Sequence, residues 1–379
     1  MPGSTDAGHY FQTEASLVDS SRKATKARNE HGDPIRLPSK LLDVAADPDD
    51  DGYVYVAESA GTAKRVKLDN GDTALVYRGA VAPLTSVWSI GERLVAGCWD
   101  KRIWSWNRHT AHREETYIGH ADFIKAVCCF RLRATNILLS GAADAAIIMW
   151  NCDTGQKLHT LKGSSRGVLG FSVDPLDSTP DAAVVFSAGS IGEIRRWTIG
   201  LDAAGEAQDA PSIREHETSV YKIRFDADGD LWTASADKTA KCLARDQGWK
   251  PDTVLPHPDF VKDVVVDEAG GKVITACRDE EIRVWDRATG DLYHTFSGHY
   301  EEVTGLAIQA RLLISVSIDC TIRKWSLKPD DLMVAIAAEK DKEKREEKEK
   351  EKEKEKGKEK ESLLTQDEED ELAELMDDS

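Results

Sequence analysis

A tryptophan recurs at the end of a short strand-like segment, and this repeat constrains the fold more than any other feature of the chain. The intervals are about 40–47 residues, apart from one of about twice that length, in which Leu243 stands at the tryptophan position. Internal repeats of this period are typical of propellers and solenoids. The segments IWSW, IIMW, IRRW, IRVW and IRKW end at Trp106, Trp150, Trp197, Trp285 and Trp325.

Each repeat divides into four short apolar segments. In one repeat they are IKAVCCF, NILLSG, AIIMW and KLHTLKG, and turn-forming residues separate them. Four short antiparallel strands make one propeller blade. A helical solenoid is excluded, because the apolar residues alternate or follow one another directly and do not recur every three or four positions.

The repeats also share a pattern of polar residues. Gly119-His120 and Gly298-His299 precede strands, Ser-Gly-x-x-Asp or a variant follows, and Trp-Asp or Trp-Asn ends the unit. On these motifs the chain resembles the WD-repeat (WD40) family over residues 39–328, about three quarters of its length. The resemblance implies an all-β fold, a seven-bladed WD40 β-propeller whose first strands start near Leu41, Leu84, Ile124, Val168, Val220, Val261 and Val303.

Three repeats depart from the family pattern. The first lacks the His and the Trp, the fourth has Gly192 in place of the turn Asp, and the fifth lacks the Trp. Such departures are tolerated because neighbouring blades hold each blade in place. The N-terminal segment usually closes the ring in this family, so residues 1–38 are expected to supply a strand from Tyr10–Val18 or Ile35–Pro38, with Leu332–Ile336 as a rival.

A His, a Ser or Thr, and an Asp recur together in four repeats. One such trio has the composition of a nucleophilic triad, but four copies at one repeat phase favour a structural role. The resemblance implies hydrogen-bonded tetrads, in which the Asp orients the His, the His bonds the hydroxyl, and the hydroxyl bonds the indole N–H of a Trp where one is present. The sets are His120, Ser140, Asp144 and Trp150; His216, Thr233 and Asp237; His257, Thr275, Asp279 and Trp285; and His299, Ser315, Asp319 and Trp325.

The resemblance further implies which positions of each blade face the top of the disc, where a partner would bind. These positions combine aromatic residues with cations, a composition typical of interaction hot spots. We hypothesise a top face that takes an acidic or phosphorylated peptide, with an aromatic anchor near Trp99. The alternative is that Phe123 and Phe260 pack inward between blades. The predicted partner-binding residues are Trp99, Phe123, Lys125, Tyr221, Phe260, Lys262 and Arg278.

Beyond the repeats, the chain ends in two charged segments. Residues 329–361 are predicted to be a disordered Lys/Glu-rich linker, because 11 acidic and 11 basic residues follow one another from Glu339 to Glu361 and bury nothing. Residues 362–379 hold eight acidic and no basic residues. Leu372, Leu375 and Met376 would share one face of a short helix, which predicts either a second partner-binding motif, a tail that docks on the basic top face, or a solubilising acidic tail.

Charge and motifs exclude several function classes. The net charge of −18 disfavours general attraction to nucleic acid. The seven cysteines form no Cys-x-x-Cys pair, so neither a metal nor a cofactor is expected. The N-terminus lacks the pattern of a signal peptide, and no apolar run is long enough to span a membrane. A soluble protein of the cytoplasm, the nucleus or both is expected.

These features predict a non-catalytic scaffold or adaptor, a monomer within a larger complex. One alternative is a chromatin- or RNA-associated subunit of a nuclear complex. Another is a substrate receptor of a ubiquitin ligase, although no F-box-like region precedes the repeats and the Trp-Asp-x-Arg docking signature is absent, because Arg287 comes one place early. An enzyme would need a catalytic set that is not repeated, and none is found.

Overall fold

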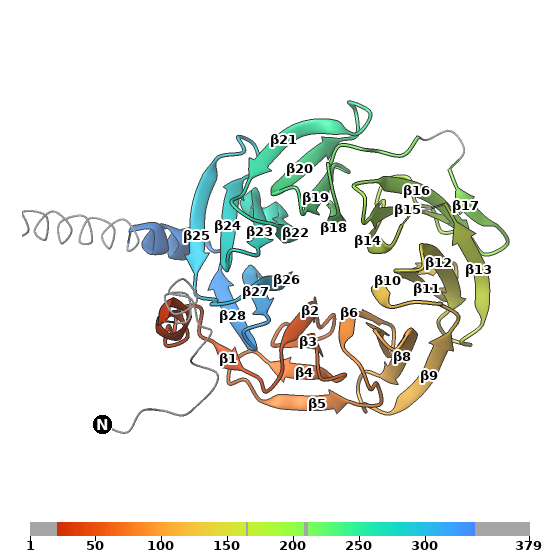
Figure 1. The fold of residues 1–379 in the computed structure, drawn as a ribbon, viewed down its shortest axis with the longest axis horizontal. Coiled ribbons are helices and arrows are strands. Elements are labelled where there is room, and N and C mark those ends of the chain that lie inside the picture. Colours follow the sequence, from red (N-terminus) through yellow and green to blue (C-terminus); the bar gives the residue numbers. More distant parts are fainter. Residues whose placement is uncertain (1–20, 164–165, 208–210, 338–379) are drawn as a thin grey trace, which may run out of the picture. The chain divides into compact units, whose positions relative to one another are not determined.

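The computed structural model describes residues 21–163, 166–207 and 211–337. Within residues 1–327, seven four-stranded antiparallel sheets form blades around a central channel (Figure 1). The predicted all-β, seven-bladed propeller is confirmed. In the separate unit Lys328–Ser379, residues 329–337 are helical, and the rest of the predicted linker and the predicted acidic motif lie outside the described residues. No helix in the described ranges is long and apolar enough to cross a membrane.

In blades 1 to 6 the four strands follow chain order from the channel outward. Blades 1 to 3 comprise β2 (Leu41–Ala46), β3 (Tyr53–Glu58), β4 (Ala63–Lys67) and β5 (Thr73–Tyr77); β6 (Leu84–Ile90), β7 (Arg93–Cys98), β8 (Arg102–Asn107) and β9 (Arg113–Ile118); and β10 (Ile124–Leu132), β11 (Thr135–Ala142), β12 (Ala146–Asn151) and β13 (Lys157–Lys162). Blades 4 to 6 comprise β14 (Val168–Val173), β15 (Ala182–Gly189), β16 (Ile194–Gly200) and β17 (Ala204–Glu206); β18 (Val220–Phe225), β19 (Leu231–Ser235), β20 (Thr239–Ala244) and β21 (Lys250–Pro256); and β22 (Val261–Asp267), β23 (Lys272–Cys277), β24 (Glu281–Asp286) and β25 (Leu292–Ser297).

Blade 7 is completed by a strand from the other end of the propeller. Its strands are β26 (Val303–Gln309), β27 (Leu312–Ser317), β28 (Thr321–Ser326) and, on the outside, β1 (Ile35–Arg36). Ile35 pairs with Ile322, and the Leu37 N–H donates to the carbonyl of Cys320. Of the other candidates for this strand, Tyr10–Val18 lies outside the described residues, and Leu332–Ile336 is helical. The ring is therefore closed by residues from both ends of the propeller, in one sheet.

Burial explains why each strand takes its place in a blade. The second strands are buried on both faces, as in β23 and β27, because the sheets of two neighbouring blades cover them. The outer strands alternate between exposed and buried residues, as in β21, because only one face packs on a neighbour. Apolar runs thus become second strands and alternating segments become outer strands.

The hydrophobic core lies between blades, not at one centre. One cluster joins Leu139 and Met149 of blade 3 to Val168 and Val185 of blade 4. The boundary between the last and first blades is packed in the same way, with Ile314 against β2 and β3. Each blade is therefore stabilised by its neighbours, as the departures of repeats 1, 4 and 5 from the family pattern require.

Candidate functional site

A β-bulge shapes the rim of the channel in all seven blades. In each first strand, pairing with the second strand shifts after the first residue, so the next residue is left out of the ladder. A bulge bends the strand and re-aims the side chain of the extra residue. The skipped residues are Leu42, Thr85, Lys125, Leu169, Tyr221, Lys262 and Thr304.

A backbone hydrogen bond fixes two further rim positions beside each other. In blade 2 the Trp99 N–H donates to the carbonyl of Pro83, 3.0 Å away. The same bond recurs in every blade, between the loop after the second strand and the residue before the first strand. We call the end of the propeller that carries these loops the top face. The donor and acceptor pairs are Ser59 and Lys40, Trp99 and Pro83, Ala143 and Phe123, Ser190 and Gly167, Ala236 and Ser219, Arg278 and Phe260, and Ile318 and Glu302.

Three of the predicted partner-binding residues form one cluster across the boundary of blades 2 and 3. The rings of Trp99 and Phe123 are stacked, with centroids 5.5 Å apart and an interplanar angle of 22°. Lys125 Nζ lies 5.1 Å from the Trp99 ring and 5.9 Å from the Phe123 ring. Trp99 is 41% exposed and Phe123 40% exposed, so Phe123 does not pack inward between blades. We call Trp99, Phe123 and Lys125 the aromatic–cation cluster.

The electrostatics of Lys125 follow from this packing. Burial lowers the pKa of the Lys125 ammonium, the nearby Asp122 carboxylate opposes that shift, and the charge of Lys262 adds to it, so the pKa is below its ordinary value. Within the described part of the chain, no acidic side chain forms an ion pair with Lys125 at up to 4.0 Å. The cluster therefore holds a partly desolvated cation beside exposed aromatic surface.

The other four predicted residues form two cation–π pairs on blades 5 and 6. Lys262 Nζ lies 4.0 Å from the Tyr221 ring, and the Arg278 guanidinium 5.1 Å from the Phe260 ring. Both cations have acidic neighbours: Lys262 is paired with Glu302 at 3.0 Å, and Arg278 lies 3.7 Å from Asp259. Phe260 is partly exposed. The seven residues are thus brought to one face, but not into one continuous cluster.

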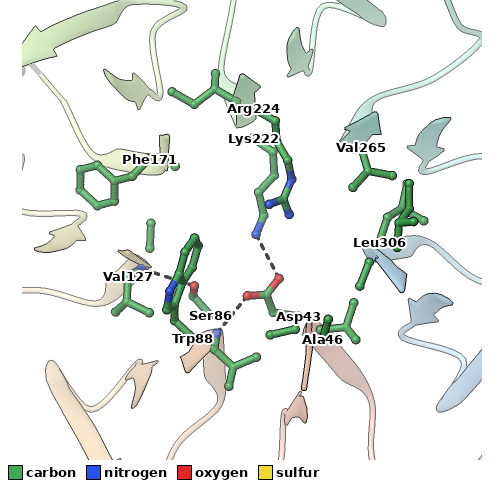
Figure 2. A pocket seen from close by; sticks show the side chains of 18 of the residues that line it. Asp43, Ala46, Ser86, Trp88, Val127, Phe171, Lys222, Arg224, Val265 and Leu306 are labelled. Atoms are coloured by element: carbon green, nitrogen blue, oxygen red, sulfur yellow. Dashed lines mark hydrogen bonds and ion pairs between the residues drawn. The ribbon is translucent and has the colours of Figure 1, made fainter. Parts of the chain in front are cut away.

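The central channel holds a pocket of about 520 Å³ that is lined mainly by residues of the first strands. Figure 2 shows Lys222 and Arg224 extending into it from blade 5, and Asp43 from blade 1. Lys222 Nζ and Asp43 Oδ1 are 3.0 Å apart. Burial alone would lower the pKa of Lys222, but the charges of Asp43 and Asp263 raise it above its ordinary value. The channel is therefore crossed by an ion pair.

The tetrad predicted in the third repeat is complete in its hydrogen bonds. His120 Nδ1 lies 3.1 Å from Asp144 Oδ2, and His120 Nε2 lies 2.8 Å from the hydroxyl of Ser140. The Trp150 indole N–H donates to the same hydroxyl at 2.9 Å. Because both ring nitrogens and the indole have partners, these buried polar groups hold the three inner strands of the blade together.

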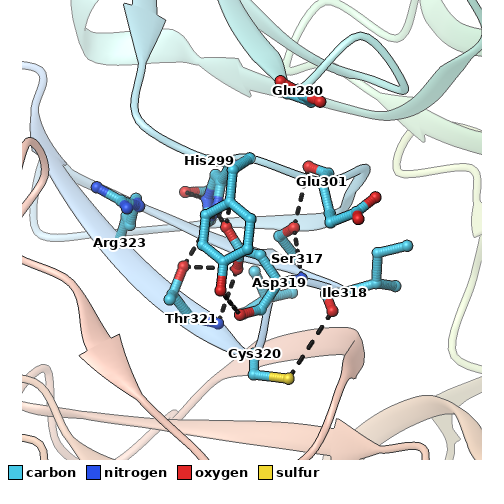
Figure 3. A network of polar contacts seen from close by, with 12 residues as sticks. Glu280, His299, Glu301, Ser317, Ile318, Asp319, Cys320, Thr321 and Arg323 are labelled. Carbon is cyan, nitrogen blue, oxygen red and sulfur yellow. Dashed lines mark hydrogen bonds and ion pairs between the residues drawn. The ribbon is translucent and has the colours of Figure 1, made fainter. Parts of the chain in front are cut away.

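Blade 7 repeats this arrangement, and Figure 3 shows its His299 beside Asp319 and Thr321. His299 Nδ1 lies 2.8 Å from Asp319, and Nε2 lies 2.8 Å from the Ser315 hydroxyl, to which Trp325 donates at 3.0 Å. Asp319 also accepts from the hydroxyl of Thr321 at 2.7 Å. Burial would raise the pKa of Asp319, but the hydrogen bond from His299 holds it below its ordinary value.

Blade 5 has the same contacts without an indole. His216 lies 2.7 Å from Asp237 and 2.7 Å from the Thr233 hydroxyl, while Leu243 stands at the tryptophan position. Burial would raise the pKa of Asp237, but the hydrogen bonds from His216 and Thr239 hold it well below its ordinary value.

In blade 6 the predicted role of Asp279 is wrong. The His257–Thr275 and Trp285–Thr275 bonds are present at 2.8 and 2.9 Å. Among the hydrogen bonds and ion pairs of the described chain, none joins His257 to Asp279. The Asp279 carboxylate binds Arg283 instead, at 2.6 Å. Blade 7 also has an arginine four residues after its turn Asp, Arg323, but there His299 keeps the carboxylate. In blade 6 the His257 Nδ1 lies 3.0 Å from the carbonyl of Leu255, and Arg283 binds the carboxylate in its place.

The sequence did not predict two kinds of contact that the structure shows. In blade 4, which has no His, the Trp197 indole still donates to Ser187 at 2.8 Å. Between blades, an Asp at the end of a first strand pairs with an Arg of the next blade. The signal in the sequence is an Arg two places after the tryptophan position. The Asp and Arg pairs are Asp47 and Arg108, Asp174 and Arg245, and Asp226 and Arg287; in a fourth pair, Asp267 and Arg311, the Arg comes from the loop after β26.

The tetrad hydroxyls have no access to solvent. Ser140, Thr233, Thr275 and Ser315 are each 0% exposed. Each already bonds a histidine, and three of them also bond an indole. A nucleophile needs an open approach for its substrate, so this geometry fits a structural role of the hydroxyls within the blade.

Comparison with known proteins places the chain in a family. A family model for the WD domain, G-beta repeat, matches residues 210–242, 249–286 and 290–326. The chain is 26% identical over 257 residues to the nuclear distribution protein PAC1 of Arthroderma benhamiae, covering 65% of this chain and 49% of that protein. It is 26% identical over 186 residues to pre-mRNA-processing factor 19 of Mus musculus, covering 46% of this chain and 33% of that protein. The chain thus spans half or less of these two relatives.

A third relative matches nearly end to end. An uncharacterised WD repeat-containing protein of Schizosaccharomyces pombe is 35% identical over 336 residues, covering 84% of this chain and 89% of that protein. The WD40 propeller is in general an interaction fold that binds protein partners. With over a third of the aligned residues identical across most of both chains, this protein belongs to the WD-repeat (WD40) family.

Proposed function

We propose that this protein is a non-catalytic scaffold that binds an acidic or phosphorylated peptide of a partner protein on its top face. The observation that carries the proposal is the aromatic–cation cluster. Its two rings expose apolar surface beside a cation that has no ion-pair partner among the described residues. A carboxylate or phosphate group of a peptide would supply that partner, and an apolar side chain next to it would cover the rings.

The rigid frame supports this function. The rim residues stand on bulges and on loop-to-loop hydrogen bonds that recur in all seven blades, so a peptide would meet preformed geometry. Lys262 and Arg278 would extend the cationic surface once they exchange Glu302 and Asp259 for a stronger acceptor on the peptide. We expect the protein to act within a larger complex in the cytoplasm or the nucleus, which the names of the relatives fit.

Substitution within the cluster tests the proposal. Binding of an acidic and phosphorylated peptide library to the full chain identifies a ligand, and titration calorimetry then compares Trp99→Ala and Lys125→Gln with the unaltered protein. We expect each to weaken binding at least tenfold, since hot-spot residues contribute about 2 kcal/mol or more. Arg278→Glu is expected to have a smaller effect in the same direction.

Tyr293→Ala provides a matched control. Tyr293 is 37% exposed and lies 4.2 Å from Lys272 Nζ, so it is a cation–π pair of the same kind on the outer strand of blade 6. This variant should leave peptide affinity within twofold. Equal affinities of the Trp99→Ala, Lys125→Gln and unaltered proteins for every peptide bound would refute the proposal.

A further inference from the structure

The helical residues 21–26 contact blade 6 through charged groups. Arg22 donates to both carboxylate oxygens of Glu280, at 2.6 and 2.7 Å. Lys26, one turn later, donates to Glu280 at 2.9 Å and to Glu281 at 2.8 Å. These hydrogen bonds hold the pKa of Glu280 below its ordinary value, against the opposing effect of burial. Two cations at i and i+4 thus match one pair of adjacent glutamates.

A third ion pair links the same helix to blade 7. Lys23 Nζ lies 2.9 Å from Glu301, which precedes the first strand of that blade. Glu280 and Glu301 both belong to top-face loops, and Figure 3 labels both. No side chain of residues 21–26 is buried. Residues 21–26 therefore contact the propeller through ion pairs and bury no apolar side chain of their own, and the partly exposed pair of Lys23 and Glu301 is of the kind that contributes about 0–1 kcal/mol.

The residues after the helix are anchored differently. The Lys324 N–H donates to the carbonyl of Gly32 at 2.7 Å, and Arg323 donates to the carbonyls of Asn29 and His31. At Gly32 a side chain would meet the indole of Trp325, since an added Cβ would lie 2.7 Å from the ring. The base of the segment is thus part of blade 7, whereas residues 21–26 are held by ion pairs, of which those to Glu280 are largely covered.

Glu280 itself occupies a backbone position that does not favour glutamate. It has φ 77°, in the left-handed region, and its equivalents in the other blades share that conformation. The left-handed conformation does not favour a glutamate over other residues. Glu280 therefore contributes to the contact through its carboxylate, and the residue is almost fully covered. Glu280 is the only acid at this position. Its equivalents are Gly61, Lys101, Ala145, Gly192, Lys238 and Cys320.

We infer that Glu280, Glu281 and Glu301 form a second recognition site, for a basic segment of a partner protein, and that residues 21–26 occupy it as a displaceable strap. The partner would present Arg or Lys at the spacing of Arg22 and Lys26. The strap competes from within the chain at high effective concentration, so a free basic peptide binds the intact protein weakly. This site takes the opposite charge from the aromatic–cation cluster and does not depend on it.

A peptide added in trans tests the inference. The probe is a fluorescent synthetic peptide with the sequence of residues 21–30, and its binding to the full chain is followed by anisotropy. Arg22→Glu/Lys26→Glu in the full chain should release the strap, and we expect it to bind the peptide at least tenfold more tightly than the unaltered protein. Adding Glu280→Gln/Glu301→Gln to that variant should reverse the gain. Adding only Glu301→Gln to the released variant, which leaves the blade 6 turn intact, should weaken peptide binding about threefold.

Lys157→Glu/Lys250→Glu is the matched control. It changes the net charge by the same amount on blades 3 and 5, and it should bind the peptide no better than the unaltered protein. Thermal unfolding of each variant checks that the propeller is intact. The inference is overturned if the released variant binds the peptide no more tightly than the unaltered protein, or if the control binds it as tightly as the released variant. It is also overturned if Glu301→Gln does not change the affinity of the released variant.

Discussion

The ammonium group of Lys222 and the carboxylate of Asp43 lie 3.0 Å apart across the central channel, although 179 positions separate them in the chain. Asp43 also accepts the N–H of Val87 at 2.9 Å. One aspartate thus connects blade 1 to blade 5 across the channel and to blade 2 beside it. The pair is covered on most sides, with 6% of the Asp43 side chain exposed and 26% of the Lys222 side chain.

Removing one partner of this pair should cost more than removing both charges. Lys222→Met leaves the Asp43 carboxylate buried without its cation, and we expect the free energy of unfolding to fall by about 2–3 kcal/mol. Asp43→Asn/Lys222→Met should recover about half of that loss, because the amide can still accept the N–H of Val87. Urea unfolding of the two variants measures this. A double variant less stable than Lys222→Met would contradict the expectation.

Removing the hydroxyl of Ser140 should lower the free energy of unfolding more than removing that of Ser187. Ser140→Ala leaves the Nε2 of His120 and the Trp150 indole without a partner, whereas Ser187 serves the Trp197 indole. Each buried group left unpaired costs about 1–3 kcal/mol. We expect a loss of about 2–4 kcal/mol for Ser140→Ala and about 1–2 kcal/mol for Ser187→Ala in chemical denaturation. Equal losses would mean that the histidine contributes little to the tetrad.

Substituting the turn Asp of blade 7 should lower the free energy of unfolding more than substituting that of blade 6. Asp319→Asn weakens the contact with His299 in a fully buried site, so a loss of about 3 kcal/mol is expected. Asp279→Asn affects a pair with Arg283 in which both side chains are partly exposed, and about 1 kcal/mol is expected. Thermal unfolding compares them, and a larger effect of Asp279→Asn would contradict the contacts described for blade 6.

Acid should destabilise blade 6 through His257. Burial lowers the pKa of His257 to about 4, and the Arg283 charge adds to that shift. Because the unfolded chain binds a proton near pH 6.5 and the folded chain does not, the stability is present above pH 6.5 and is lost as the pH falls towards 4, by on the order of 3 kcal/mol. Unfolding measured from pH 7.5 to 4.5 should therefore show the unaltered protein losing more stability than His257→Gln. Parallel pH profiles of the two proteins would refute this.

Much of this architecture can be predicted from the sequence because the sequence repeats. The tryptophan period predicts the blades, and the first residues of all seven first strands lie where the pattern places them, since each is an aliphatic residue that must be buried between two sheets. The pattern also brings Trp99 and Phe123 to one face, because both stand at fixed positions relative to a strand. The same pattern of buried and turn residues recurs in the repeats, so a repeat that departs from it does not prevent the fold from being predicted.

Which donor binds a recurring carboxylate, and which segment closes the ring, could not be predicted in this way. The position of Asp279 in its repeat matches that of Asp319, yet Arg283 takes its carboxylate, and which donor wins depends on distances within the folded blade. The pairing of Ile35 with Ile322 is of the same kind, since several segments could have served as the closing strand.

The sequence by itself determined the period, the blade count and the residue types at each repeat position, because burial and turn geometry act within a few residues. Only the tertiary structure decided that Lys222 meets Asp43, that Lys125 lies beside two stacked rings without an acidic partner among the described residues, and that Arg22 and Lys26 meet Glu280. Those relationships join charges or rings from different blades, or from the N-terminal segment and a blade, and they exist only once the ring has closed and fixed the distances between them.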